Sequence, residues 1–287
     1  MSKRALRLLA ATTALGALGL LACASDPGPP PPSPLRQDAH RAAESGRASF
    51  EERRFEASAR AYGRAARTYG ALDDPEAEAA ALRGQGEALR RNGSVEAATE
   101  AFERALALDR RRDDPVAHAL DWAGLARCAR DRGEIENAVA AVERALGLAG
   151  IEPSLRAALG SDLALHLLAR GRADDRPRIL ALLAAARDQA VADDDARRAA
   201  VAYLNLGHAN RRFGDPARAE AELRQALERF RALDDPAGLA RTHEELARVE
   251  RDQDRPDAAR SHEEQARRGY EFLGAEADLE RLRAGPR

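Results

Sequence analysis

Short turn segments return along the chain about every 40 residues, and this period limits the possible folds more than any other feature of the sequence. The turns contain Gly93, Gly133, Gly171, Gly214 and Asp254, so successive turns lie 40, 38, 43 and 40 residues apart. Segments in which one or two acidic residues precede a proline recur with a similar spacing, at Asp73-Asp74-Pro75, Asp113-Asp114-Pro115, Glu152-Pro153 and Asp234-Asp235-Pro236, and we call them acidic-proline links. Aspartate can accept hydrogen bonds from the free N–H groups that begin a helix, and proline fits the first helical turn. The period therefore predicts hairpins of two helices.

The expected second helices carry small residues seven positions apart, which lets neighbouring helices approach closely. These helices contain Ala98, Phe102 and Ala105, then Ala138, Val142 and Ala145, then Ala219, Leu223 and Ala226. The expected first helices contain Leu82, Gly86 and Leu89, then Trp122, Leu125 and Ala126, then Tyr203, Leu206 and Gly207. This pattern resembles the tetratricopeptide repeat, in a longer variant like that of kinesin light chains. The resemblance implies an all-α, right-handed solenoid.

The resemblance covers residues 37–284 and implies about six hairpins followed by a short C-terminal helix. The hairpins are expected at 37–72, 75–112, 115–151, 153–191, 195–233 and 236–273. Trp122 is expected to be buried between helices. The fourth hairpin departs most from the pattern, because Gly160 occupies an aromatic position and residues 173–177 lengthen its turn. Residues 276–284 are expected to form a polar end cap, which terminal solenoid repeats require.

The N-terminus has the features of a targeting segment. Residues 1–22 join a basic start to an apolar run, and the run ends Leu20-Leu21-Ala22-Cys23, which resembles the lipobox of bacterial lipoproteins. The resemblance implies a lipidated Cys23, a proline-rich linker over 23–36 and, because no aspartate follows the cysteine, a location on the periplasmic face of the outer membrane. The alternative is cleavage at Ala22-Cys23-Ala24, which would release a soluble periplasmic or secreted protein.

Charge and motifs exclude several function classes. The chain has 46 Lys and Arg against 48 Asp and Glu, so it lacks the basic excess of a nucleic-acid binder, and its 33% charged residues exclude a polytopic membrane protein. His243-Glu244 begins like a zinc motif, but Ala247 stands where the second histidine is needed, which makes His243 an expected surface residue. Asp193 to Asp195 match a helix start, and Cys128 is expected to be a small buried filler. We therefore expect no enzyme activity, cofactor or metal.

The resemblance implies a binding groove, because the first helices of tetratricopeptide arrays line the concave face. The residues expected on this face are Arg83, Arg90, Arg91, Arg127, Arg130, Leu165, Leu168, His208, Arg211, Arg212, Arg248 and Arg251. Arginines on both sides of an apolar centre would suit an acidic protein segment with one hydrophobic anchor. The alternative is a solvated surface, since Lys3 is the only lysine and arginine is the ordinary surface cation of this chain.

These features favour a non-enzymatic adaptor that is anchored through its N-terminal lipid and binds an envelope protein in the groove. Two alternatives remain open. One is a soluble periplasmic or secreted accessory of an enzyme or sensor system. The other is a self-assembling structural protein, against which the polar C-terminal cap argues.

Overall fold

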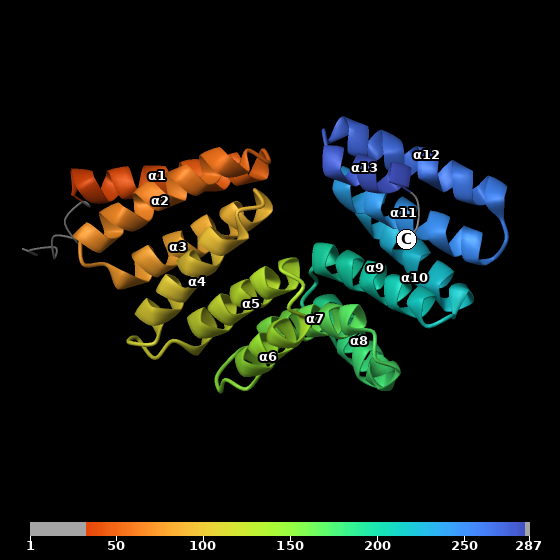
Figure 1. Ribbon diagram of the computed structural model, residues 1–287, viewed down its shortest axis with the longest axis horizontal. Coiled ribbons are helices and arrows are strands. Elements are labelled where there is room, and N and C mark those ends of the chain that lie inside the picture. Colours follow the sequence, from red (N-terminus) through yellow and green to blue (C-terminus); the bar gives the residue numbers. More distant parts are fainter. Residues whose placement is uncertain (1–32, 285–287) are drawn as a thin grey trace, which may run out of the picture.

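The computed structural model describes residues 33–284, and helices are its only regular secondary structure within this range (Figure 1). Each helix packs mainly against its neighbours in the sequence, so the helices form six hairpins and a single last helix. This confirms the predicted fold class, an α-solenoid of tetratricopeptide-like hairpins with a short C-terminal capping helix.

The twelve hairpin helices and the last helix have clear bounds. They are α1 Pro34–Glu51, α2 Phe55–Ala71, α3 Pro75–Arg91, α4 Val95–Asp109, α5 Pro115–Asp131, α6 Ile135–Leu146, α7 Pro153–Arg170, α8 Arg176–Ala192, α9 Ala196–Arg212, α10 Pro216–Ala232, α11 Pro236–Asp252, α12 Pro256–Phe272 and α13 Glu276–Ala284. The first helix starts at Pro34, inside the expected linker, because the Ser33 side chain accepts a hydrogen bond from the Arg36 N–H. The irregular fourth hairpin contains a short 3-10 helix, η1 Ala173–Asp175.

Four of the five links between hairpins contain two acidic residues that act differently; the exception is the link before α7, where Gly150 is left-handed and the Glu152 side chain makes no cap. The first, such as Asp73, has a φ of 52°, in the left-handed region that aspartate tolerates better than most residues. The second, such as Asp74, accepts a hydrogen bond from the N–H three residues later, at 3.1 Å for Ala77. Within hairpins, glycines such as Gly133 take the left-handed position. The triplet Asp193 to Asp195 follows the same rule, since Asp195 accepts from the Arg198 N–H at 2.9 Å.

The core consists of large side chains enclosed by small ones. Phe102 is 2% exposed and lies between α3 and α5, where a Cβ added at Gly86 or Gly124 would come within 2.8 or 2.3 Å of its ring. Cys128 is fully buried in the same cluster, as expected. Glycine at these two positions therefore allows one ring to fill the space between two hairpins.

Two burial predictions were wrong. Trp122 is only partly buried, because it lies at the edge of the core beneath the guanidinium groups of Arg144 and Arg110, at 4.9 and 6.0 Å from the ring centroid. His243 is half-buried rather than on the surface, because α12 packs over it and places the Nδ1 of His262 2.9 Å from its own Nδ1.

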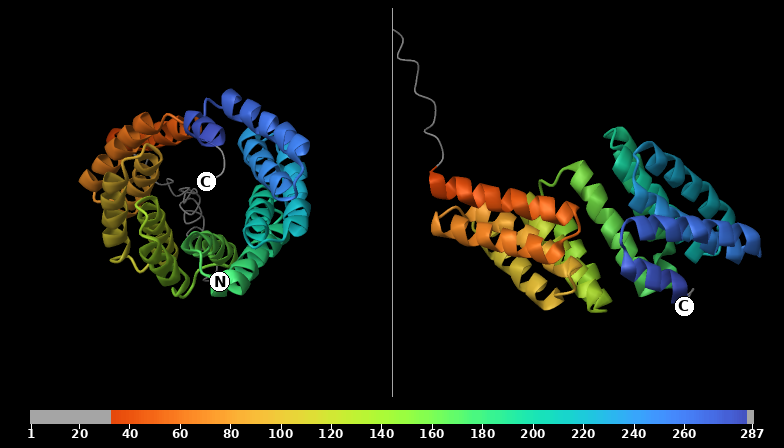
Figure 2. Two further views of the ribbon diagram at one scale, coloured as in Figure 1. Left: turned by 45° about the vertical axis from the view of Figure 1, so that its right-hand side comes forward. Right: turned by 90° about the horizontal axis from the view of Figure 1, so that it is seen from above.

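The hairpins follow an arc with α7 and α8 near its middle, and Figure 2 shows this arc winding around a central axis. Odd-numbered helices of successive hairpins contact one another more than even-numbered helices do, which places the odd-numbered helices on the shorter, inner side. At the C-terminal end, Arg281 of α13 donates to Glu244 of α11 at 2.7 Å. Among residues 33–284, none of the helices has the length and apolar character needed to cross a bilayer.

The contrast between Phe102 and Trp122 gives a test of the packing. Phe102→Ala should lower the free energy of unfolding by about 3 to 5 kcal/mol, as large core truncations do, and Trp122→Ala should cost less because solvent already reaches the indole. Because solenoid contacts are local, hydrogen exchange should accelerate first around α3 to α5. Equal acceleration over all helices of the Phe102→Ala variant would contradict this local picture.

Candidate functional site

The arginines of the inner face are joined to acidic residues of the following hairpin. Arg90 of α3 donates to Asp131 of α5 at 2.6 Å, and Arg211 of α9 donates to Asp252 of α11 at 3.2 Å. Both pairs span 41 residues, so they occupy equivalent positions in different hairpins. The repeat thus produces the same bridge twice.

A second type of bridge lies about one helical turn away, between α5 and α7 and between α9 and α11. Arg127 of α5 lies 3.3 Å from Asp162 of α7, and His208 of α9 lies 3.0 Å from Glu245 of α11. Glu245 also pairs with Arg211 and Arg248. Burial raises the pKa of Glu245, but the hydrogen bond from His208 and these positive charges outweigh burial and lower this pKa to about 2. The carboxylate is therefore ionised at neutral pH.

These bridges change the role predicted for most of the groove residues. The ion-paired members are Arg83 with Asp109 and Asp121, Arg90 with Glu87 and Asp131, Arg127 with Glu87 and Asp162, Arg130 with Asp131, His208 with Glu245, Arg211 with Glu245 and Asp252, Arg248 with Glu244 and Glu245, and Arg251 with Glu263. Their charges are balanced within the chain, so an acidic ligand would have to compete with carboxylates already in place.

The remaining predicted residues are not in such bridges. Arg91 is stacked over the Phe55 ring at 5.1 Å, and Arg212 is exposed. Leu165 is partly exposed on the inner face. Leu168 is 7% exposed and belongs to the central core cluster, so little of its side chain is available to a ligand.

The series of bridges stops between the fourth and fifth hairpins. Leu165 occupies the position that Arg127 and His208 hold in their hairpins. Asn205 occupies the position of their acidic partners, Asp162 and Glu245. In the other bridge, Leu168 occupies the position of Arg90 and Arg211. Arg212 occupies the position of their acidic partners, Asp131 and Asp252. Neither bridge can form here, which leaves α7 and α9 without the ion pairs that join the other inner helices.

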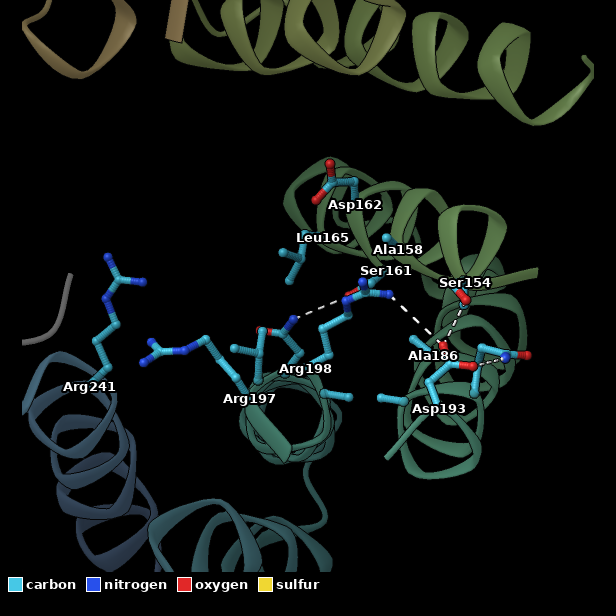
Figure 3. Close-up of a pocket in the computed structure, with 16 residues that line it drawn as sticks. Ser154, Ala158, Ser161, Asp162, Leu165, Ala186, Asp193, Arg197, Arg198 and Arg241 are labelled. Carbon is cyan, nitrogen blue, oxygen red and sulfur yellow. Dashed lines mark hydrogen bonds and ion pairs between the residues drawn. The ribbon is translucent and has the colours of Figure 1, made fainter. Parts of the chain in front are cut away.

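A pocket of about 430 Å³ lies at this interruption (Figure 3). It is lined by Ser154, Ala157, Ala158, Ser161, Asp162 and Leu165 of α7, by Ala186, Gln189 and Ala190 of α8, by Asp193, by Arg197, Arg198, Val201, Ala202 and Asn205 of α9, and by Arg241 of α11. Figure 3 shows Arg197 extending away from Leu165 toward Arg241. The lining is mostly apolar, with Arg197, Arg198 and Arg241 at the rim and the carboxylates of Asp162 and Asp193 also lining the pocket.

The rim arginines differ in how far they are neutralised. Arg197 donates to Asp235 at 2.6 Å with its side chain 64% exposed. Arg241 is exposed and forms none of the ion pairs found among residues 33–284. Burial lowers the pKa of Arg91, and the positive charges of Arg90 and Arg241 act in the same direction. An unbalanced positive charge therefore remains near the pocket.

The sequence pattern predicted Leu165 at this site but not the arginines of the pocket. Arg197 and Arg241 lie outside the stripe expected to face the groove. The signal available in the sequence was the presence of small residues such as Ser161 and Ala190 in the fourth hairpin, which line the pocket.

Two buried polar groups lie behind the inner face. Asp109 and Asp121 are both fully buried and share Arg83, which lies 3.4 Å from Asp121. His166 is fully buried in α7, and neither ring nitrogen has a hydrogen-bond partner within the described part of the chain. Burial, helped by the charges of Arg130 and Arg127, lowers the pKa of His166 to about 4. This histidine is neutral at physiological pH.

No group of three or more His, Cys, Asp or Glu side chains is placed to hold a metal ion between residues 33 and 284. His243 and His262 form only a pair. Burial, the proximity of His262 and the charge of Arg231 lower the pKa of His243 to about 4.

The repeated hairpins define a tetratricopeptide-type α-solenoid. The family model described as tetratricopeptide repeat matches residues 198–271, which contain parts of the fifth and sixth hairpins. No curated protein sequence matches the chain.

Solved structures extend the similarity over most of the chain. The crystal structure of BtubC (BKLC) from P. vanneervenii is 21% identical with a TM-score of 0.60, and the match covers 85% of this chain and 93% of that one. A Rap protein complexed with Competence and Sporulation Factor is 13% identical with a TM-score of 0.66, covering 86% and 73%. The apo form of RapI is 13% identical with a TM-score of 0.68, covering 85% and 86%. At these identities the similarity shows the fold.

The buried carboxyl pair predicts a pH dependence of stability. Burial and the neighbouring Asp109 raise the pKa of Asp121 to about 7, although Arg83 opposes this shift. Between about pH 4 and pH 7 the folded chain therefore keeps a proton that the unfolded chain releases. This contribution to stability is present at low pH and is lost as the pH rises, with a limiting slope of about 1.4 kcal/mol per pH unit.

Asp121→Asn should remove this slope. Urea titrations should find the variant more stable than the wild type at about pH 8 and equal to it at about pH 4. Comparing the two proteins cancels the titration of His166 and His243, which both retain. A stability difference that is the same at both pH values would refute the protonated Asp121.

Proposed function

We propose that this protein is a non-enzymatic adaptor, held by an N-terminal lipid on the periplasmic face of the outer membrane, that binds a segment of an envelope protein on its inner face. The observation that carries the binding role is the interrupted series of ion pairs. Where the bridges are complete, the inner face is balanced by its own carboxylates. Where they stop, an apolar pocket with free arginine charge is exposed.

The binding mode has support from energetics and from fold. Exposed ion pairs contribute only about 0 to 1 kcal/mol each, so a partner gains most where apolar surface is also buried. Leu165 and Val201 provide such surface between the arginines. A Rap protein of this fold has been crystallised with Competence and Sporulation Factor, which is consistent with a solenoid of this kind receiving a ligand.

The membrane anchor is proposed from the sequence alone, since residues 1–32 lie outside the described part of the structure. Cys23 at the end of the apolar run is the residue that would carry the lipid, and several acyl chains suffice for stable anchoring where one does not. The proline-rich segment that follows would hold the solenoid away from the membrane surface.

Replacing the cysteine tests the anchor. Cys23→Ser should abolish incorporation of a palmitate analogue in metabolic labelling and leave uncleaved precursor. Cys128→Ser serves as the control, because that thiol is fully buried and should not affect labelling. Label retained by the Cys23→Ser protein would overturn the lipoprotein proposal, and a processed soluble product in the wild type would favour the secreted alternative.

Photo-crosslinking in intact cells tests the inner face. A photoreactive amino acid at Leu165 should form adducts with an envelope protein, whereas the same group at Arg178, which is exposed on α8, should not. Mass spectrometry of the adduct identifies the partner. Adducts that form equally at Arg178 would place the interaction away from the inner face.

A further inference from the structure

The pocket arises because the fourth hairpin lacks side chains that fill the same place elsewhere. Tyr69, Phe230 and Tyr270 are 7%, 2% and 1% exposed, and the carbonyl of each accepts a hydrogen bond from the N–H five residues later. Ala190 makes the same bond, at 2.9 Å from the Asp195 N–H, so it occupies the equivalent position. A ring is therefore missing where three other hairpins have one.

Two further reductions occur around the same point. Phe230 packs with Tyr203 and Leu204, which lie eight and nine residues after the aspartate that begins α9. The same count from Glu152 reaches Gly160 and Ser161 in α7. Alanine at 190 and serine at 161 thus replace phenylalanine and leucine, and both line the pocket between α7, α8 and α9. At Gly160 a Cβ would meet Leu182 of α8 at 3.3 Å, so this position packs against α8 and does not line the pocket.

One large side chain, Arg198, lines this space. Arg198 stands three residues after Asp195, where Gly238 and Ala77 stand in other hairpins. Its Nε lies 2.8 Å from the Asp195 carboxylate, its guanidinium also lies 4.0 Å from Asp193, and its side chain is 53% exposed. Figure 3 shows this guanidinium between Ser161 and Asp193, so Arg198 forms one wall of the pocket that remains.

We infer that this pocket is a socket for one bulky apolar side chain of a partner protein segment, and that a carboxylate next to that side chain pairs with Arg241 and Arg197 at the rim. The inference rests on the proposed function and specifies its site. A side chain entering the socket would replace the ring that the solenoid packs at Tyr69, Phe230 and Tyr270.

Charge and accessibility favour a protein segment with this pattern. Arg241 has no intramolecular carboxylate partner among the ion pairs of residues 33–284, and Arg197 has only one, so both can accept an acidic neighbour. Val201 is 41% exposed at the pocket, which leaves the floor open to the inner face. A chain lying along the inner helices could insert a side chain here while its flanks follow the neighbouring hairpins.

Selection from a displayed library of random 12-residue peptides tests the inference, with the full chain in detergent micelles as target. The enriched peptides should share one aromatic or large aliphatic residue beside Asp or Glu. Their affinities are then measured by fluorescence anisotropy. Peptides enriched without this pattern would overturn the inference.

Filling the socket gives the decisive comparison. Ala190→Tyr combined with Arg198→Ala reproduces the Tyr69 and Ala77 pair, so it should raise the thermal midpoint and weaken the enriched peptides at least tenfold. Arg198→Ala alone is the reference variant: it removes the arginine without filling the socket, so the double variant should bind the peptides at least tenfold more weakly than this single variant does. Unchanged affinity in the folded, filled variant would overturn the socket.

The rim can be tested without altering the packing. Arg241→Gln should weaken the same peptides several-fold, and less so at high salt, because screening already reduces that pair. Arg212→Gln removes an equal charge from an exposed position outside the pocket and should have no effect. Equal losses in both variants would reject a specific role for Arg241.

The outcomes also separate this inference from the adaptor proposal. Peptides that bind but ignore the filled socket reject the socket and leave the inner face as the binding surface. If no peptide is enriched, the socket is rejected, and crosslinking at Leu165 then decides the adaptor proposal independently.

Discussion

Close approach of neighbouring hairpins through small residues is the constraint on which the rest of the structure depends. A ring such as Phe102 can fill the space between two hairpins only because Gly86 and Gly124 have no side chain there. The same approach brings the inner helices near enough for Arg90 to reach Asp131 in the next hairpin. Packing thus sets the spacing, and the spacing makes the ion pairs possible.

One position in the second helix of each hairpin shows how a repeat can acquire different local properties. Tyr69 and Phe230 fill it with a ring, which seals the junction to the next hairpin. Asp109 lies five residues before Asp114, as Tyr69 lies five residues before Asp74, so it occupies the same position in the second hairpin. There it forms a buried charge cluster with Arg83 and Asp121. Ala190 leaves the space open. A ring, a carboxylate or a methyl group at this position therefore accompanies a sealed, a charged or an open junction, and the open junction also has Ser161 where α9 has Leu204.

The sequence predicted the features that depend on local pattern. The period, the acidic-proline links and the burial of Cys128 follow from neighbouring residues and helical spacing. Features that depend on the partner of a side chain were not predictable in this way. Trp122 was expected in the core because its neighbours are apolar, but its depth is set by how α6 and the α4 end pass over it. Arginine pairing likewise requires knowing which carboxylate of the next hairpin lies opposite.

The recurrence of bridges in register has a consequence for how the chain can be rearranged. Removing the fourth hairpin as a unit would join the third to the fifth and set Arg130 against Arg212, two like charges at a place where other junctions carry a bridge. Removing the third would set Glu87 against Asp162. Hairpins of one backbone shape are therefore not interchangeable modules, and their order along the chain is encoded in the charges on their inner edges.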